Sequence, residues 1–207
     1  MPVHLVDHPL VHDALTVLRN KDTSSEMFRR TATRISVILA VEALRDVPTV
    51  ATTVETPLGP AAGSRLKGDL VVVPVLRAGL GMLDAVLELV PYARVGHIGL
   101  QRDEMTAVAS YYYSKLPPAV EQSSVVMIDP MLATGGSAVA ALDLLQRAGA
   151  RSVRIVCIVA APEGVELVEQ RHPDVHIYTP VVDRGLNAQK FIVPGLGDFG
   201  DRLYGTT

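Results

Sequence analysis

The feature of this sequence that most constrains its fold is an alternation of apolar, β-branched runs with segments of helical periodicity, beginning at about Asp69. Residues 70–76 are apolar at consecutive positions, which is typical of a strand buried on both faces of a sheet. Residues 79–90 follow, with a helically spaced apolar face formed by Leu80, Leu83, Leu87 and Val90. Such alternation predicts an α/β fold, with a parallel sheet and helices on both of its faces.

The same alternation continues to about residue 178. Further strands are expected at 95–100, 125–128, 153–160 and 175–178. Further helices are expected at 137–148, which Gly149 ends, and at 163–171. The sequence before this core holds a helical stretch at 31–45 and a β-rich piece at 49–56, and we interpret it as an appendage packed on the core.

Residues 101–124 interrupt the alternation. These 24 residues include three consecutive tyrosines, Tyr111, Tyr112 and Tyr113, and a Pro-Pro pair. A loop of this length inside a compact domain is uncommon unless it acts as a lid or a binding loop. The tyrosines are interpreted either as lid contacts that exclude water or as surface packing, and the sequence favours neither.

Composition excludes several classes of protein. With 48% hydrophobic and 20% charged residues, the chain does not have the composition of a disordered protein. A formal net charge of −3 disfavours bulk binding to nucleic acid, so no nucleic-acid partner is expected. No signal-peptide pattern opens the sequence, and no apolar run approaches the roughly 18–20 residues of a membrane span. We therefore expect a soluble, cytoplasmic protein, in which the single cysteine, Cys157, is a small buried side chain.

The segment from Val125 to Ser137 carries the strongest chemical signal. An apolar strand ends in Asp129, a short loop of small and hydroxylated residues follows, and a helix is expected to start at Ser137. Free N–H groups at a helix N-terminus, together with the helix dipole, form an anion site. Gly135 and Gly136 allow close approach of the backbone, and the hydroxyl groups of Thr134 and Ser137 are additional donors.

The acid in this loop narrows the class of ligand. Asp129 ends its strand where open α/β sheets bind their ligands. A phosphate group alone does not need a carboxylate, so the combination suggests a sugar phosphate whose ribose hydroxyls face Asp129. The loop is not a Walker A motif, because it has no lysine. The alternative interpretation is an ordinary strand–turn–helix in which Ser137 is only a capping residue.

The loop resembles a known family. Its sequence, Asp-Pro-Met-Leu-Ala-Thr-Gly-Gly-Ser over 129–137, is similar to the ribose-phosphate loop of type I phosphoribosyltransferases, in the form found in uracil phosphoribosyltransferases. Pro130 stands where most type I relatives carry a second acid. Three other segments resemble the family in the same order: a pyrophosphate loop at 74–81, the start of a flexible loop at 102–104, and a C-terminal hood at 178–185 and 191–202.

The resemblance implies one phosphoribosyltransferase domain over residues 1–207. Within it, residues 1–67 would form an N-terminal appendage with a β-arm, 68–180 the parallel α/β core, and 181–207 a hood over the base site. The implied reaction transfers the 5-phosphoribosyl group of phosphoribosyl pyrophosphate to uracil, giving UMP and pyrophosphate, as in pyrimidine salvage. Mg²⁺ is the implied cofactor, held mainly by the substrate and water, with Asp129 in reach through a water molecule.

The resemblance also assigns residues to the site. The phosphoribosyl pyrophosphate site is implied to consist of Arg77, Arg102, Asp129, Pro130, Met131, Leu132, Ala133, Thr134, Gly135, Gly136, Ser137 and Asp198. Uracil is implied to lie among Ile192, Gly197, Asp198 and Phe199. The residues implied to take part in catalysis are Asp129, Arg102 and Asp198.

Several points stay open in the sequence. Many relatives have a small residue where Phe199 stands, so its side chain either points away from the base or alters base preference. Asp201 and Arg202 are interpreted either as part of the hood motif or as an exposed pair. Family members form dimers, often through a β-arm such as 49–56, and some assemble further and respond to GTP. No GTP motif is present, so a GTP effector is left as a possibility.

Three alternative functions are less consistent with the sequence. A nicotinamide-binding Rossmann domain is disfavoured, because Asp84 occupies the third glycine position after Gly79-Leu80-Gly81. A pyrimidine-operon RNA-binding regulator on the same fold would need a basic face, which the net charge of −3 argues against. A transferase for another base, such as a purine, would usually keep the second loop acid that is absent here.

Overall fold

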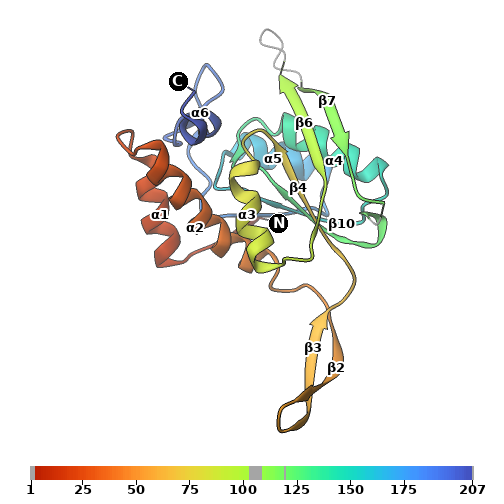
Figure 1. Ribbon diagram of the computed structural model, residues 1–207. Helices are drawn as coiled ribbons and strands as arrows, with labels where there is room; N and C mark the ends of the chain where they lie inside the picture. Colours follow the sequence, from red (N-terminus) through yellow and green to blue (C-terminus); the bar gives the residue numbers. More distant parts are fainter. Residues whose placement is uncertain (1–2, 103–108, 119, 207) are drawn as a thin grey trace.

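The computed structural model describes residues 3–102, 109–118 and 120–206 (Figure 1). Its centre is a sheet in the order β1-β12-β10-β8-β4-β6-β7, with β5 also paired to β4. Every pairing is parallel except that of β6 with β7, so the prediction of a mainly parallel α/β sheet is confirmed. The strands of this sheet are β1 (Val3–Leu5), β4 (Leu70–Leu76), β5 (Arg94–Val95), β6 (His97–Arg102), β7 (Ala109–Lys115), β8 (Ser124–Ile128), β10 (Ser152–Val156) and β12 (His176–Thr179).

Helices cover both faces of the sheet (Figure 1). In β4, Leu70 and Val72 pack with the cluster that includes α1, α2, α3 and α6, whereas Val71 and Val73 pack with α4 and α5. Because successive side chains of a strand point to opposite faces, a strand covered on both sides must be apolar at every position. The helices are α1 (Pro9–Arg19), α2 (Ser25–Ala43), α3 (Leu80–Leu89), α4 (Gly136–Arg147), α5 (Pro162–Arg171) and α6 (Phe199–Tyr204).

The N-terminal segment is more closely built into this core than the sequence indicates. Strand β1 pairs in parallel with β12 at the edge of the sheet. Helix α1, which the sequence pattern did not predict, begins with Pro9 after an N-cap at His8. Helix α2 starts at Ser25, six residues before the predicted stretch, because the hydroxyl of Ser24 accepts the N–H of Met27 as an N-cap.

Two predicted details of the core are wrong. Helix α3 buries Met82, Ala85 and Val86, while Leu80, expected on the buried face, is 37% exposed. The apolar residues of this short helix are spread around its axis, so periodicity alone does not define the face that meets its neighbours. The segment 101–124 is also not one long loop. Strand β7 lies within it and pairs antiparallel with β6, and the short helix η1 (Val120–Gln122) follows.

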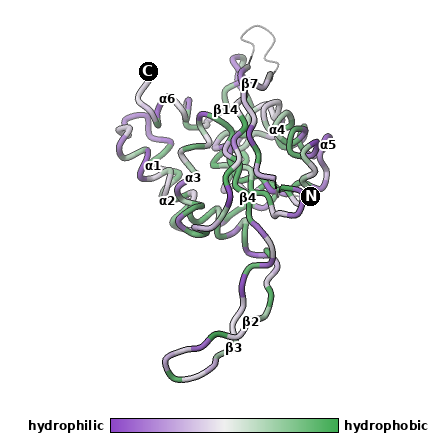
Figure 2. The backbone as a smooth tube through the Cα atoms, turned by 45° about the vertical axis from the view of Figure 1, so that its right-hand side comes forward, coloured by the Kyte–Doolittle hydropathy of each residue, from purple (hydrophilic) through white to green (hydrophobic). Residues whose placement is uncertain are grey.

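The β-rich piece at 49–56 is confirmed as β2 (Thr49–Thr56). Among the described strands it pairs only with β3 (Gly59–Leu66), and this hairpin projects from the body of the molecule as a long arm (Figures 1 and 2). Strand β3 could not be predicted from propensity, because it is rich in glycine, alanine and proline. Leu58, at the tip, is fully exposed.

The C-terminal segment forms a cap beside the carboxyl ends of the central strands. It consists of a small antiparallel hairpin, β13 (Gly185–Leu186) with β14 (Ile192–Val193), followed by α6. A further short parallel pair, β9 (Met131–Leu132) with β11 (Val159–Ala160), lies beyond the ends of β8 and β10. Within the described ranges no helix is long and apolar enough to cross a membrane.

Two aromatic rings pack the C-terminal helix α6 against the N-terminal helix α2. Phe28 of α2 and Phe199 of α6 are fully buried, and their rings meet edge to face with centroids 5.1 Å apart. A Cβ atom on Gly81 of α3 would lie 2.6 Å from the side chain of Leu203, so α3 packs closely against the same helix. Cys157 is fully buried as expected, and burial raises the pKa of its thiol to about 12.

This packing makes a prediction about stability. Phe199→Ala should lower the free energy of unfolding by about 3–5 kcal/mol, because it removes a buried ring and leaves a cavity beside Phe28. Urea unfolding followed by circular dichroism measures the change. Phe191→Ala is the matched control, since that ring is 48% exposed on the same cap and should change stability by only about 0.5 kcal/mol. A loss below about 1 kcal/mol for Phe199→Ala would contradict the packing.

Candidate active site

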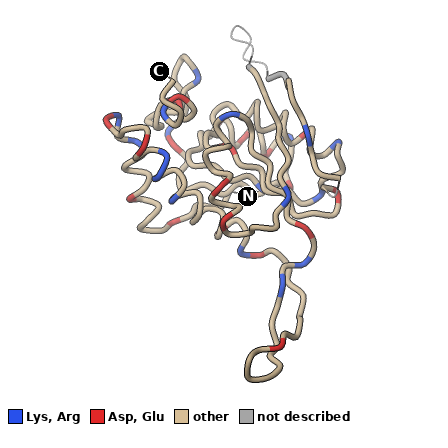
Figure 3. Tube along the Cα trace, in the orientation of Figure 1, with Lys and Arg blue, Asp and Glu red and all other residues tan. Residues whose placement is uncertain are grey.

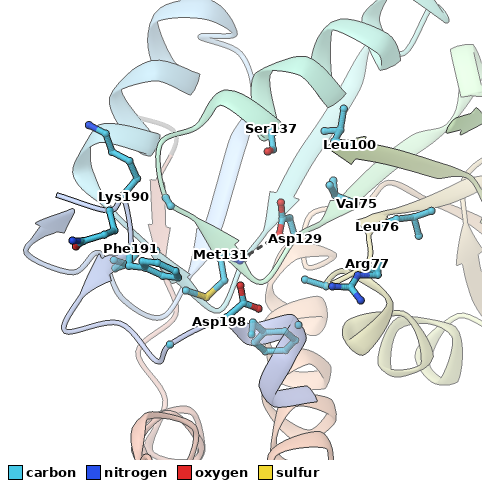
Figure 4. A pocket seen from close by; sticks show the side chains of 17 residues that line it. Val75, Leu76, Arg77, Leu100, Asp129, Met131, Ser137, Lys190, Phe191 and Asp198 are labelled. Atoms are coloured by element: carbon cyan, nitrogen blue, oxygen red, sulfur yellow. Dashed lines mark hydrogen bonds between the residues drawn. The ribbon is translucent and has the colours of Figure 1, made fainter. Parts of the chain in front are cut away.

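A cavity of about 360 Å³ lies at the carboxyl ends of β4 and β8, between the core and the C-terminal cap (Figure 4). This is where open α/β sheets bind ligands. Figure 4 shows side chains from three different parts of the chain pointing toward one space, namely Arg77, Asp129 and Asp198. The cavity is lined by Val75, Leu76, Arg77, Ala78, Leu100, Asp129, Met131, Ala133, Ser137, Gln189, Lys190, Phe191, Ile192, Gly197, Asp198, Phe199 and Gly200.

The loop after β8 presents alternate residues to this cavity. Asp129, Met131 and Ala133 line it, whereas Leu132 is 3% exposed and packs into the core. The alternation follows from β9, since residues 131 and 132 pair with β11 in an extended conformation. Pro130 is buried, and its carbonyl accepts the N–H groups of Ile158 and Val159 at 2.9 and 3.1 Å. Pro130 and Leu132, both predicted site residues, therefore support the loop from behind.

The end of the loop turns sharply into α4. Gly135 is the N-cap and has φ of +80°, and a Cβ there would lie 2.9 Å from the carbonyl oxygen of Gly164. Only glycine fits both the backbone conformation and the contact. The hydroxyl of Thr134 accepts the N–H of Gly136 at 3.4 Å. These three residues form the turn, and they do not line the cavity itself.

Helix α4 begins at Gly136, so Ser137 is inside the first turn. The interpretation of Ser137 as a mere cap is therefore wrong, and its side chain borders the cavity instead. The N-cap residue, Gly135, has no side chain to cap α4, and the hydroxyl of Thr134 accepts the N–H of Gly136. The positive end of the α4 dipole lies beside the cavity that Ser137 borders.

Arg77 follows β4 on a loop that packs tightly against β8. The Leu76–Arg77 peptide bond is cis. A Cβ on Gly79 would lie 2.4 Å from the carbonyl oxygen of Ile128, so only glycine lets this loop lie so close to the neighbouring strand. The hydroxyl of Tyr204 donates to the carbonyl of Arg77 at 3.3 Å, while the Arg77 guanidinium is exposed at the edge of the cavity.

The cap closes the cavity from the opposite side. Ile192, Gly197 and Asp198, three of the residues predicted to surround the base, line it. The carboxylate of Asp198 accepts the N–H of Asp201 at 2.9 Å and so caps α6. The ring of Phe199 is 1% exposed and lies in the core, so this residue contributes to the cavity wall without a ring that projects into it.

Arg202 is not half of an exposed pair, as one interpretation had it. Its guanidinium donates to the carbonyl of Leu196 at 2.7 Å and to that of Leu18, and it lies 4.5 Å from the centroid of the Phe28 ring. Burial lowers the pKa of Arg202 from its ordinary value. The guanidinium therefore ties the cap to the end of α1.

Some predicted residues cannot be placed. Arg102 ends β6 near the cavity side of the sheet, but its side chain lies outside the described part of the structure. Asp103 and Glu104, which begin the expected flexible loop, also lie outside the described residues. Tyr111, Tyr112 and Tyr113 are on β7, are exposed and do not line the cavity.

Sequence reasoning missed part of the wall. Leu76 is the last residue of β4, Ala78 follows it in the loop before α3, and Leu100 lies in the second half of β6; all three line the cavity. Gln189 and Lys190 come from the turn of the cap hairpin. That turn is closed by the side-chain oxygen of Asn187, which accepts the N–H groups of Gln189 and Phe191. An asparagine that forms such a turn is the local signal for it.

The donor set fits a cation held mostly by a ligand. Among the described residues, no group of three or more His, Cys, Asp or Glu side chains is arranged to hold a metal ion. Asp129 is a half-buried carboxylate at the cavity wall. Mg²⁺ prefers oxygen ligands, keeps several waters and commonly binds through one or two carboxylates and substrate phosphates. Asp129 is therefore suited to a magnesium ion that a polyphosphate substrate carries.

Comparisons with known proteins identify relatives that match nearly the whole chain. The family model described as uracil phosphoribosyltransferase matches residues 5–206. A uracil phosphoribosyltransferase of Halalkalibacterium halodurans is 50% identical over 205 residues, covering 99% of this chain and 98% of that protein. One of Rhodococcus opacus is 51% identical over 205 residues, with the same coverage.

Solved structures extend the comparison to the fold. A protein of Aquifex aeolicus is 39% identical, covers 99% of both chains and superposes with a TM-score of 0.95. An adenine phosphoribosyltransferase from Trypanosoma brucei, solved with AMP, pyrophosphate and ribose-5-phosphate, is 14% identical, covers 88% of this chain and 84% of its own, and has a TM-score of 0.56, a likeness of fold alone. With a family model over nearly its full length and relatives at about half identity, this chain belongs to the uracil phosphoribosyltransferase family.

Proposed function

We propose that this protein transfers the 5-phosphoribosyl group of phosphoribosyl pyrophosphate to uracil. The observation that carries the proposal is the meeting of three unlike features around one cavity: the N-terminus of α4, the Asp129 carboxylate, and the cap residues Ile192 and Gly197. An anion site, an acceptor for sugar hydroxyls and an exposed backbone edge match the three parts of the product, UMP.

The phosphate end of the substrate is suited to the loop and the start of α4. Backbone N–H groups at a helix N-terminus bind a phosphate group without needing a lysine. The hydroxyl of Ser137 is an additional donor beside them. Asp129, at the end of β8, is then placed for the ribose hydroxyls, which donate hydrogen bonds to a carboxylate.

The pyrophosphate end needs positive charge. As the bond from C1 to the pyrophosphate oxygen breaks, negative charge builds on the leaving group, and a fixed cation stabilises it. The Arg77 guanidinium, at the cavity edge, can bind diphosphate oxygens with two parallel hydrogen bonds. We assign Arg102 a similar role on the basis of the family motif. Mg²⁺, when bound with the substrate, neutralises further charge on the same oxygens.

In this proposal, uracil is recognised mainly through hydrogen bonds to backbone groups. Its two carbonyls and its N–H complement the N–H and C=O groups of the segment around Ile192 and Gly197. A site that pairs with the 4-oxo group leaves the amine of cytosine poorly paired. Asp198 lines the cavity, and we assign it the role of receiving or steering the N1 proton as the bond from N1 to C1 forms.

An RNA-binding regulator on the same fold is not supported. Basic and acidic positions are interspersed along the trace in Figure 3, and the formal net charge is −3. RNA binding through phosphates needs a basic surface. The relatives at about half identity are also named as the enzyme.

The β2–β3 arm supports a homodimer as part of the proposal. It pairs with no other strand of the described chain, and Val50 and Val54 are exposed along it. An isolated two-stranded hairpin is marginally stable in water. A second copy of the chain would cover the arm and provide the packing that it lacks.

The central test is base specificity. The protein, with Mg²⁺ and phosphoribosyl pyrophosphate, is incubated separately with uracil, cytosine, hypoxanthine and adenine, and nucleotides are separated by chromatography. We expect UMP from uracil and no nucleotide from the other bases. Product from hypoxanthine, or no product from any base, would refute the proposal.

The role of Asp129 is tested by Asp129→Asn. Turnover should fall by roughly 10²-fold or more, since the substitution removes the charge beside the ribose and the magnesium ion. Unfolding free energy should change by less than about 1 kcal/mol, because the side chain is half-exposed at a strand end. Asp69→Asn, at the opposite end of β4, is the control and should keep full activity. Unchanged turnover in Asp129→Asn would remove this residue from the site.

The role of Arg77 is tested through product inhibition. Arg77→Ala should raise the inhibition constant of pyrophosphate by about tenfold, because a bidentate, charge-assisted contact is lost. Arg94→Ala serves as the control, since Arg94 lies on β5 in an ion pair with Asp69 and does not line the cavity. An inhibition constant equal to that of the unmodified protein would count against the role of Arg77.

A further inference from the structure

A partly buried ion pair lies behind the base side of the cavity. The side chain of Asp183, just before β13, is 4% exposed, and that of its partner Arg19 is 24% exposed. The two oxygens of Asp183 accept from both terminal nitrogens of Arg19, at 2.7 and 3.0 Å, in a bidentate arrangement. Arg19 is the last residue of α1, a helix more than 160 residues away in the sequence.

The same pair holds both backbone polar groups of one glycine. The N–H of Gly195 donates to Asp183 at 2.8 Å, and the carbonyl of Gly195 accepts from Arg19 at 3.2 Å. Gly195 has φ of +58°, and a Cβ there would lie 2.2 Å from the carbonyl oxygen of Ile192. The chain is therefore folded tightly on itself at this point, and the ion pair fixes the orientation of the turn.

This turn is the centre of the segment that the proposed function uses to read the base. Ile192 and Gly197, on either side of the turn, line the cavity, whereas Arg19 and Asp183 do not. The next carbonyl, that of Leu196, accepts from Arg202. Three charged side chains thus hold residues 195 and 196 from outside the cavity, while the flanking residues face the ligand space.

The desolvation cost of the Arg19–Asp183 ion pair indicates that the pair orients the turn at Gly195. Removing two charges from water is expensive, and apolar residues of similar volume often give equal or greater stability. A bidentate contact instead defines direction, because the planar guanidinium and the carboxylate must face each other. The position of the backbone groups that bind the base matters more than the strength of their hydrogen bonds, since a misplacement of about 1 Å can lower the rate roughly 10²-fold.

We propose that Arg19 and Asp183 are positioning residues for uracil, which hold Gly195 so that the backbone at residues 192 and 197 presents the base-reading edge. The inference rests on the proposed function for the identity of the base. It makes α1, which touches no part of the cavity, a determinant of base affinity.

The test uses two conservative variants of the full-length protein. Arg19→Lys keeps the charge but loses the planar fork, and Asp183→Asn keeps the shape and one acceptor but loses the charge. KM for uracil should rise by about tenfold in both variants, as expected for the loss of a charge-assisted contact. KM for phosphoribosyl pyrophosphate should stay within about twofold, because the loop at 129–137 and Arg77 do not depend on the pair.

A matched control separates positioning from general destabilisation. Asp13 of α1 and Arg34 of α2 form another ion pair, at 2.7 Å, but both side chains are exposed and neither lines the cavity. Asp13→Asn should leave both KM values unchanged. Hydrogen exchange by mass spectrometry gives a second measurement that does not depend on activity: amides in 192–198 should exchange faster in Arg19→Lys and Asp183→Asn, and not in the control.

The outcomes separate the two proposals. Faster exchange in 192–198, with a selective rise in KM for uracil, supports the positioning role. Unchanged exchange in residues 192–198 of either folded variant, or an equal rise in the KM values for uracil and phosphoribosyl pyrophosphate, overturns it. If the unmodified protein makes no UMP, the proposed function fails, and the exchange measurement alone still decides whether the pair positions the turn.

Discussion

The burial of both faces of the central strands is the constraint on which the rest of the structure depends. Strands β4 and β8 are apolar along nearly their whole length and have helices on either side. A strand of this kind has no face left for polar chemistry, so functional groups are confined to its ends. Arg77 follows β4 directly and Asp129 follows β8 directly, and the parallel pairing of the two strands brings both residues to one edge.

That edge forms only part of the site. The other wall is formed by the C-terminal cap. The strands of the cap do not pair with the central sheet. The cap is held by Phe199 against Phe28, by Arg202 on the carbonyls of α1 and the cap, and by Asp183 with Arg19. All three contacts join the C-terminal segment to α1 and α2. The N-terminal helices therefore belong to the architecture of the site, although none of their side chains lines the cavity.

Much of the core, and the loop at 129–137, could be predicted because their conformations depend on the local sequence. β4 and β2 have the predicted bounds, and the apolar strand, acid and glycine-rich turn before α4 all depend on neighbouring residues. The predictions failed where distant residues decide. Strand β3 has little β-propensity and forms because β2 pairs with it. The sequence left two interpretations of Arg202 open, and its contacts with Leu18 and Phe28 decide between them.

Taken alone, the sequence determined the parallel α/β class, the loop from Asp129 to Ser137, and the identity of the residues at the strand ends. Periodicity, glycine and the helix start are local properties, and each can be recognised in one short segment. Only the tertiary structure decided which loop residues face the ligand space and which support it, and that Phe199 lies in the core. It also placed Asp183 and Arg19 against the turn at Gly195, next to cavity residues Ile192 and Gly197. Such contacts depend on how segments far apart in the chain pack together, and no local pattern encodes that packing.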